Sequence, residues 1–260
     1  KLGSERFEAT EALFKPELMG LECMGEVDEA VQAEVLRLAL ASLAALDVPT
    51  VLEVSHMGFV TGLLDALNVP AAYRARLVEL LCAKNEHELR KAALHAGLDA
   101  AGADALCGLL TLHGPFGATL TAAKATAASP AQKAALAELQ ALQNVLGESG
   151  RGLQLDLSMA DEAEYYNGIV FTGYVAGVPR AVLKGGQYDY LMQRFTPGAK
   201  AIGFAMYLDE LERLAAPLPP VQQQGGEKVW LNIALPKGRL GDKAYALLAG
   251  AGYSANEDYN

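Results

Sequence analysis

Two segments of the chain carry side chains whose types and spacing could bind a small polar molecule. The first, EYYNGIVFTGYV, holds the adjacent tyrosines Tyr165 and Tyr166. The second, KGGQYD, contributes Gly185 and Gly186 and then Tyr188. Phenol rings can enclose a ligand while their hydroxyls hydrogen-bond to it, and glycines let a ligand approach the backbone closely. The pattern is compatible with a binding site, although tyrosine pairs and diglycines are also common in ordinary sheets.

A third segment, LNIALPKGRLGDKAYALL, could bind an anion. Lys237, Gly238 and Arg239 lie in a turn between an apolar strand and the start of a helix. Free N–H groups at a helix N-terminus, together with two cations, favour phosphate. The GxxxxGK[ST] pattern of a Walker loop is absent. From the residues alone, a solvated basic turn is therefore the simpler interpretation.

Composition restricts the other classes of function. The net charge of -10 and the pI of about 4.9 disfavour a dedicated binder of tRNA or DNA, because the mean field repels a polyanion. No apolar run reaches the roughly 18–20 residues of a membrane span, and we see no targeting segment. Cys23, Cys82 and Cys107 show no metal-ligand spacing, so we expect reduced core thiols in a cytoplasmic protein. We expect neither a metal nor a cofactor.

The elements that would position these residues are strands on either side of a long helical region. Alternation and β-branched or aromatic enrichment predict strands, and apolar periodicity predicts helices. The tyrosine pair falls on a predicted strand, so its two side chains should point to opposite faces. We predict strands over 16–25 (with a glycine break), 50–55, 153–158, 166–175 and 179–186, and helices over 26–46, 57–66 and 209–214. Residues 201–207 are apolar and predict either a further strand or the start of a helix.

Three regions of different character follow from the composition along the chain. Residues of about 69–150 are rich in Ala and Leu with glycine punctuation, and they predict a helical insertion. Residues 216–228 contain three prolines, three consecutive glutamines and a glycine pair, as a linker would. Residues 229–260 then begin a strand–turn–helix unit. The domain division that we expect is 1–215, 216–228 and 229–260.

The order of several blocks resembles the histidyl-tRNA synthetase family. These blocks are GLECMG, VSHMG, DLSMADEAEYYNGIVFTGY, GGQYDYL and AIGFAMYLDELERL, and they cover most of residues 15–215. The resemblance implies an α+β fold, with a class II aminoacyl-tRNA synthetase-like antiparallel sheet flanked by helices, a helical insertion and a C-terminal strand–helix extension. It also implies a histidine-binding site. The residues assigned to that site are Glu22, Tyr165, Tyr166, Gly185, Gly186 and Tyr188.

The sequence departs from the family at positions that matter for chemistry. Asp161 and Glu210 stand where the synthetases have arginines that contact substrate carboxylate and phosphates, and Tyr207 replaces a usual glycine. Two reversals of charge oppose ATP binding, so the resemblance implies no catalytic residue here. In the histidine site, Leu18 replaces a glutamine and Gln187 replaces the arginine of GGRYD.

This combination resembles the regulatory subunit of ATP phosphoribosyltransferase, a relative of the synthetases that lacks aminoacylation. The implied role is to activate the catalytic subunit of that enzyme in a cytoplasmic hetero-oligomer and to convey feedback by L-histidine in histidine biosynthesis. The segment LNIALPKGRLGDKAYALLAGAGY resembles the start of the catalytic subunit itself, which implies a phosphate or substrate role for Lys237, Gly238 and Arg239. Two alternatives are an aminoacylating histidyl-tRNA synthetase-like enzyme and a regulatory–catalytic fusion that is active in a longer chain.

Overall fold

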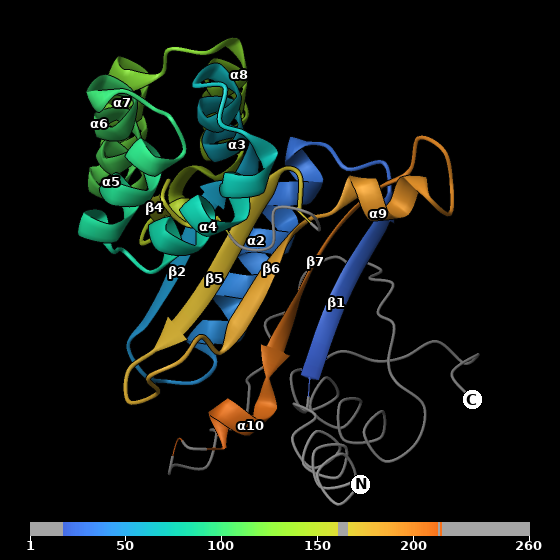
Figure 1. The fold of residues 1–260 in the computed structure, drawn as a ribbon. Coiled ribbons are helices and arrows are strands. Elements are labelled where there is room, and N and C mark those ends of the chain that lie inside the picture. Colours follow the sequence, from blue (N-terminus) through green and yellow to red (C-terminus); the bar gives the residue numbers. More distant parts are fainter. Residues whose placement is uncertain (1–17, 161–165, 213, 215–260) are drawn as a thin grey trace, which may run out of the picture.

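A seven-stranded sheet forms the centre of the molecule (Figure 1). The structure, a computed structural model, describes residues 18–160, 166–212 and 214. Every pair of neighbouring strands is antiparallel except β2 and β4, which are parallel. In spatial order the strands are β1 (Leu18–Gly25), β7 (Lys200–Tyr207), β6 (Leu183–Gln187), β5 (Ile169–Val175), β2 (Thr50–His56), β4 (Gln154–Asp156) and β3 (His113–Pro115).

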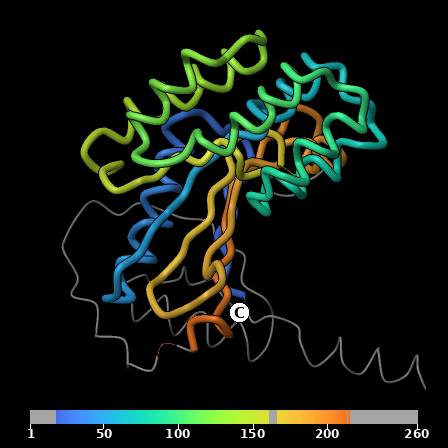
Figure 2. Tube along the Cα trace, turned by 60° about the vertical axis from the view of Figure 1, so that its left-hand side comes forward, coloured from blue at the N-terminus to red at the C-terminus, as the bar shows by residue number. Residues whose placement is uncertain are grey.

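The helices occupy two places around this sheet. Helix α2 lies across one face, whereas α3 to α8 gather at one end of the sheet, as both views show (Figures 1 and 2). Helices α9 and α10 lie at opposite ends of β7 (Figure 1). Their bounds are α2 (Glu29–Ala44), α3 (Met57–Ala66), α4 (Ala71–Cys82), α5 (Glu86–His95), α6 (Ala100–Gly108), η1 (Leu109–Thr111), α7 (Phe116–Thr126), α8 (Pro130–Leu146), η2 (Gly147–Gly150), α9 (Asp189–Gln193) and α10 (Leu208–Leu211). The predicted α+β class is confirmed.

Helix α2 begins at a side-chain cap and packs on the sheet. The carboxylate of Asp28 accepts a hydrogen bond of 2.9 Å from the backbone N–H of Val31, which satisfies one of the free donors of the first turn. The apolar side chains of Val31 and Leu38 on this helix are only half-buried. The helix contacts strands of the sheet as well as α8, and its buried face combines aliphatic side chains with one glutamine. The members of this face are Gln32, Ala33, Val35, Leu36, Ala39 and Leu43.

The helical insertion is present as predicted, with one strand that the sequence did not indicate. Strand β3 consists of His113, Gly114 and Pro115 and pairs with β4, and a run this short carries no alternation to detect. Helix α8 begins with a capping box between Ser129 and Gln132 and packs against α2 and α3. The insertion is therefore joined to the sheet directly through β3 and to the helices α2 and α3 through α8.

Two local predictions were wrong. Gly20 does not break β1, which runs without interruption to Gly25; a side chain at Gly20 would lie 3.3 Å from the backbone oxygen of Phe204. Glycine here allows close strand packing. Tyr166 is not on a strand, because it precedes β5, which starts at Ile169; Tyr165 lies outside the described residues.

The three cysteines are free thiols, but they are not all in the core. Cys107 is buried, Cys23 is half-buried, and Cys82 is exposed, with its thiol donating a 3.0 Å hydrogen bond to the backbone oxygen of Ala160. The expectation of a core thiol was thus wrong for Cys82. Within the described part of the chain, no helix is long and apolar enough to cross a membrane.

Candidate functional site

Five residues from five adjacent strands form a straight row across the sheet. Glu22 on β1 pairs with Gly203 on β7, and Gly203 pairs with Gly186 on β6. Gly186 pairs in turn with Val170 on β5, which pairs with Ser55 on β2. Side chains of directly paired residues point to the same face of a sheet. Gly173 points to the other face of β5, where a side chain would lie 2.9 Å from Leu43 of α2. The row therefore lies on the face opposite α2, which we call the front face.

Two glycines make the middle of this row flat, and neighbouring side chains occupy the space above them. A side chain at Gly186 would lie 2.7 Å from the ring of Tyr166. A side chain at Gly203 would overlap the carboxylate of Glu22. Glycine at both positions lets Tyr166 and Glu22 lie directly on the backbone of the sheet. The result is a floor of peptide groups with an aromatic ring at one side and a carboxylate at the other.

The carboxylate of Glu22 is held by Tyr188. The hydroxyl of Tyr188, which follows β6 and is buried, donates a hydrogen bond to Oε2 of Glu22. Burial raises the pKa of Glu22, and the hydrogen bond from Tyr188 opposes that rise. Among the described residues, no lysine or arginine lies within ion-pair distance of this carboxylate. The site therefore has a half-buried carboxylate whose ionised form a cation or an N–H donor would stabilise.

The two glycines of the KGGQYD block have different roles. Gly186 belongs to the front face, whereas Gly185 points to the α2 side. A side chain at Gly185 would lie 2.5 Å from Cβ of Phe204 and 2.6 Å from the ring of Phe171. Gly185 is thus required for core packing, and the structure does not bring it to the row that contains Glu22.

The charge-reversed position Glu210 has its own partner. Glu210 is buried on α10, and its Oε1 lies 3.4 Å from Nη1 of Arg180 in the loop between β5 and β6. Leu18 on β1, which stands where the family has a glutamine, is exposed and pairs with Tyr207. The remaining predicted residues lie outside the described residues: Asp161, Tyr165, Lys237, Gly238 and Arg239.

Three residues of this region were missed by the sequence reasoning. Gly203 lies in the block AIGFAMYL, and its spacing from the tyrosines could have identified it as a residue of the site. Ser55 is fully buried, and its hydroxyl has no hydrogen-bond partner among the described residues. Asp189 is buried directly after Tyr188 and is bonded to Gln187 and Asn167. Asp189 is the last residue of the KGGQYD block, which could have identified it, whereas Ser55 carries no sequence signal of its own because its burial depends on the tertiary structure.

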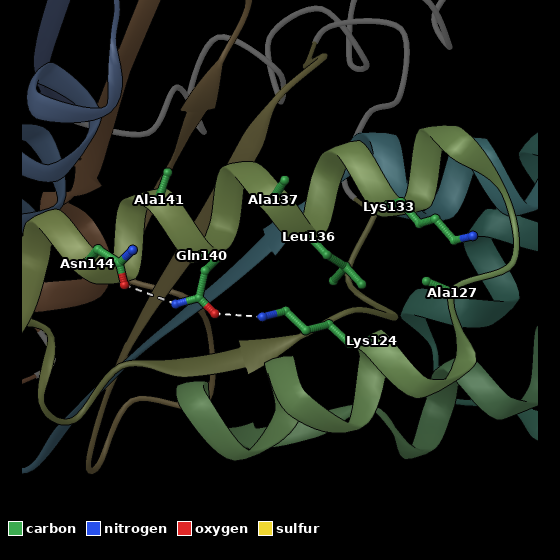
Figure 3. Close-up of a pocket in the computed structure, with 8 residues that line it drawn as sticks. All are labelled: Lys124, Ala127, Lys133, Leu136, Ala137, Gln140, Ala141 and Asn144. Atoms are coloured by element: carbon green, nitrogen blue, oxygen red, sulfur yellow. Dashed lines mark hydrogen bonds between the residues drawn. The ribbon is translucent and has the colours of Figure 1, made fainter.

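A hollow elsewhere on the surface does not belong to this site. It has a volume of about 430 Å³ and lies between α7 and α8 of the insertion (Figure 3). A 2.7 Å hydrogen bond from Lys124 to Gln140 spans it, and Gln140 also bonds Asn144 at 3.1 Å. These polar side chains satisfy one another. Among the described residues, no cluster of His, Cys, Asp and Glu could hold a metal ion.

A mostly antiparallel sheet with a covering helix on one face and a glycine-floored site on the other defines a class II aminoacyl-tRNA synthetase-like core. The chain belongs to the histidyl-tRNA synthetase family, whose model matches residues 5–211. It is 34% identical over 198 residues to the ATP phosphoribosyltransferase regulatory subunit of Ralstonia pickettii, covering 76% of this chain and 50% of that protein.

Other relatives point the same way. The ATP phosphoribosyltransferase regulatory subunit of Thermus thermophilus is 34% identical, over 83% of this chain and 56% of that protein. A crystal structure from Bacillus halodurans C, described as an ATP phosphoribosyltransferase regulatory subunit/histidyl-tRNA synthetase, is similar with a TM-score of 0.69. It is 29% identical and the match covers 77% of this chain and 54% of that one. The chain spans about half the length of the curated relatives that it matches.

Proposed function

We propose that this chain is the regulatory part of ATP phosphoribosyltransferase, the enzyme of the first step of L-histidine biosynthesis. In this role it binds L-histidine on the front face and conveys feedback inhibition to the catalytic subunit, which it otherwise activates, in the cytoplasm. The names of the relatives support the assignment. Feedback requires that histidine bind one state of the assembly more tightly than the other.

The observation that carries the proposal is the carboxylate of Glu22 above the glycine floor, which has no lysine or arginine within ion-pair distance in the described part of the chain. It is half-buried, is oriented by Tyr188, and has a raised pKa because of burial. Histidine supplies what such a carboxylate lacks, since it carries an ammonium group and an imidazole N–H, and its ring can pack against Tyr166. Tyr165, Gly185 and Gly186 complete the proposed site as the family resemblance assigns it, with Gly185 acting through packing.

Aminoacylation is the second candidate, because one similar structure is described with both names. The family arginines at positions 161 and 210 are replaced by Asp161 and Glu210. A unit charge 4 Å from a phosphate contributes about 4 kcal/mol at an effective dielectric of about 20, and reversing its sign doubles the change. The side chain of Glu210 also has Arg180 beside it. These replacements favour a regulatory role over ATP activation.

The C-terminal region supports a physical link to the catalytic subunit. We infer that residues 216–228 are a linker and that residues 229–260 begin a phosphoribosyltransferase-like domain in which Lys237, Gly238 and Arg239 lie near a phosphate. A third candidate follows, a fused protein with its own ATP phosphoribosyltransferase activity. Mass measurement of the natural protein distinguishes a separate regulatory subunit from such a fusion, because the fusion requires one further domain of about 200 residues.

Two assays on the full-length protein test the proposal. Calorimetric titration should show binding of L-histidine, and histidine-dependent exchange between ATP and pyrophosphate should be undetectable. A histidyl-tRNA synthetase from the same expression host serves as the positive control for exchange. Measurable exchange by the purified chain would establish the enzyme instead of the regulatory protein.

A further inference from the structure

Behind the front-face site, three buried polar side chains form a hydrogen-bonded chain. Gln187 donates from Nε2 to Oδ2 of Asp189 at 2.7 Å, and its Oε1 accepts from Nε2 of Gln32 at 2.9 Å. The exposed fractions of Gln32, Gln187 and Asp189 are 6%, 6% and 7%. Gln32 belongs to α2, so the chain crosses from the helix to the end of β6.

The carboxylate of Asp189 fixes the direction of this chain. It accepts hydrogen bonds from Gln187, from Nδ2 of Asn167 at 3.3 Å and from the backbone N–H of Ala201 at 3.2 Å. Because a carboxylate only accepts, Gln187 must turn its NH₂ group toward Asp189 and its oxygen toward α2. Gln32 must then present its own NH₂ group.

Gln32 keeps this orientation although it leaves one polar atom unsatisfied. Its Oε1 is buried and has no hydrogen-bond partner among the described residues, which costs stability. Gly168 provides the room for the Gln187 amide, since a side chain at Gly168 would lie 2.6 Å from Oε1 of Gln187. The local structure thus places the amide of Gln187 against α2 rather than toward the front face.

The same chain holds both segments that carry the site tyrosines. Asn167 follows Tyr166, and its backbone N–H donates to the backbone oxygen of Gln187 at 3.0 Å. Asp189 follows Tyr188, and its N–H donates to Oδ1 of Asn167 at 2.7 Å. Each tyrosine is therefore followed directly by a residue, Asn167 or Asp189, that these hydrogen bonds hold in place.

We propose that Gln32 and Gln187 are positioning residues for the front-face site: through Asp189 and Asn167 they hold the Tyr166 and Tyr188 segments in binding geometry and tie that geometry to α2. The assignment of histidine as the ligand rests on the proposed function, whereas the positioning itself is a property of the ligand-free protein. The consequence is that a change on α2 alters affinity at a site on the other side of the sheet.

The test uses the full-length chain with Gln32→Met, Gln187→Met and the double variant. Val35→Ala is the matched control, because Val35 is buried on the same helix, one turn further along. In the ligand-free protein, amide hydrogen exchange at Asn167 and Asp189 should be faster in both single variants than in the control. Calorimetry should show L-histidine bound about threefold to tenfold more weakly by Gln32→Met, the range expected for one hydrogen bond. The double variant should bind no more weakly than Gln187→Met.

Each other outcome has a definite meaning. Exchange at Asn167 and Asp189 that matches the control in both single variants overturns the positioning role. Faster exchange with unchanged histidine affinity overturns the link between the hydrogen-bonded side chains and the site. Faster exchange in a protein whose wild type does not bind histidine supports the positioning role and refutes the proposed ligand instead.

Discussion

The hydroxyl of Tyr188 and the carboxylate of Glu22 are joined by a hydrogen bond that spans the intervening strand β7. Both residues belong to the front face, and the strand between them contributes Gly203, which has no side chain to separate them. Burial raises the pKa of Glu22 against the effect of this bond. The pair is the most specific feature of the proposed histidine site, and several predictions depend on it.

Replacing Tyr188 with Phe should weaken L-histidine binding about tenfold, because one hydrogen bond to a charged group is lost while the ring is kept. Calorimetry on the full-length protein measures this change. Tyr190→Phe is the matched control, since Tyr190 is 60% exposed on α9 and lies outside the row. Equal affinities in the two variants would mean that Glu22 needs no orienting hydroxyl.

Replacing Glu22 with Gln should abolish histidine binding and yet stabilise the ligand-free protein at neutral pH. The pKa of Glu22 is raised in the folded state, so its ionisation reduces the free energy of unfolding as pH rises through that pKa. Glu22→Gln cannot ionise, so it keeps this free energy of unfolding at neutral pH. The difference in stability from the wild type should vanish in acid, where Glu22 of the wild type is protonated. Urea unfolding at several pH values checks the sign. A variant that is less stable than the wild type at neutral pH but still binds histidine contradicts both roles.

Replacing Gly203 with Ala should remove the flat floor of the site. The added methyl group would overlap Glu22 and the backbone oxygen of Leu21, so we expect a loss of about 1–3 kcal/mol in the free energy of unfolding together with loss of histidine binding. Gly108→Ala is the control, because open space surrounds that helical position, and it should be neutral or stabilising by up to about 1 kcal/mol. Normal binding by Gly203→Ala would show that the ligand lies elsewhere.

A separate pH dependence should arise where the insertion meets the sheet. Nδ1 of His56 accepts from the N–H of Gly58 at 3.1 Å, so Nε2 carries the proton that is donated to Oε2 of Glu138 at 3.0 Å. The hydrogen bond from His56 lowers the pKa of Glu138, and partial burial opposes this. Its contribution to stability is present above the ordinary carboxyl pKa and is lost as pH falls through the lowered value.

Glu138→Gln should therefore lose less stability than the wild type between about pH 5 and about pH 3. The difference should stay below about 1 kcal/mol, because half of the Glu138 side chain is exposed. Glu148→Gln, in an exposed ion pair with Arg151, is the control and should follow the wild type. Parallel curves for wild type and Glu138→Gln would show that the His56 contact is not maintained in solution.

The sequence predicted the class of the fold better than the position of individual side chains. Apolar periodicity placed α3 at Met57–Ala66 as observed, and the ordered blocks indicated the family, because both signals are local or extend along the chain. Register across strands is a different matter. That Gly186 faces the site while Gly185 packs on Phe171 follows from the pairing of β6 with its neighbours.

The least predictable residues were those whose role depends on distant partners. Gln187 looked like a weakened histidine contact, since an arginine is usual at that position. In the structure it faces α2 and bonds Gln32, which is 155 positions away. The pattern of a single strand cannot reveal a partner at that distance. Ser55 was missed for the same reason, because a lone serine on a short strand gives no sign of complete burial.

The most direct test of the regulatory role is the initial rate of a short-form catalytic ATP phosphoribosyltransferase subunit, measured with the full-length chain while L-histidine is titrated. Addition of the chain should raise the rate, and histidine should then reduce it. With Tyr188→Phe, the midpoint of inhibition should shift to about tenfold higher histidine. A rate and a histidine response that are the same with and without the chain would contradict the account.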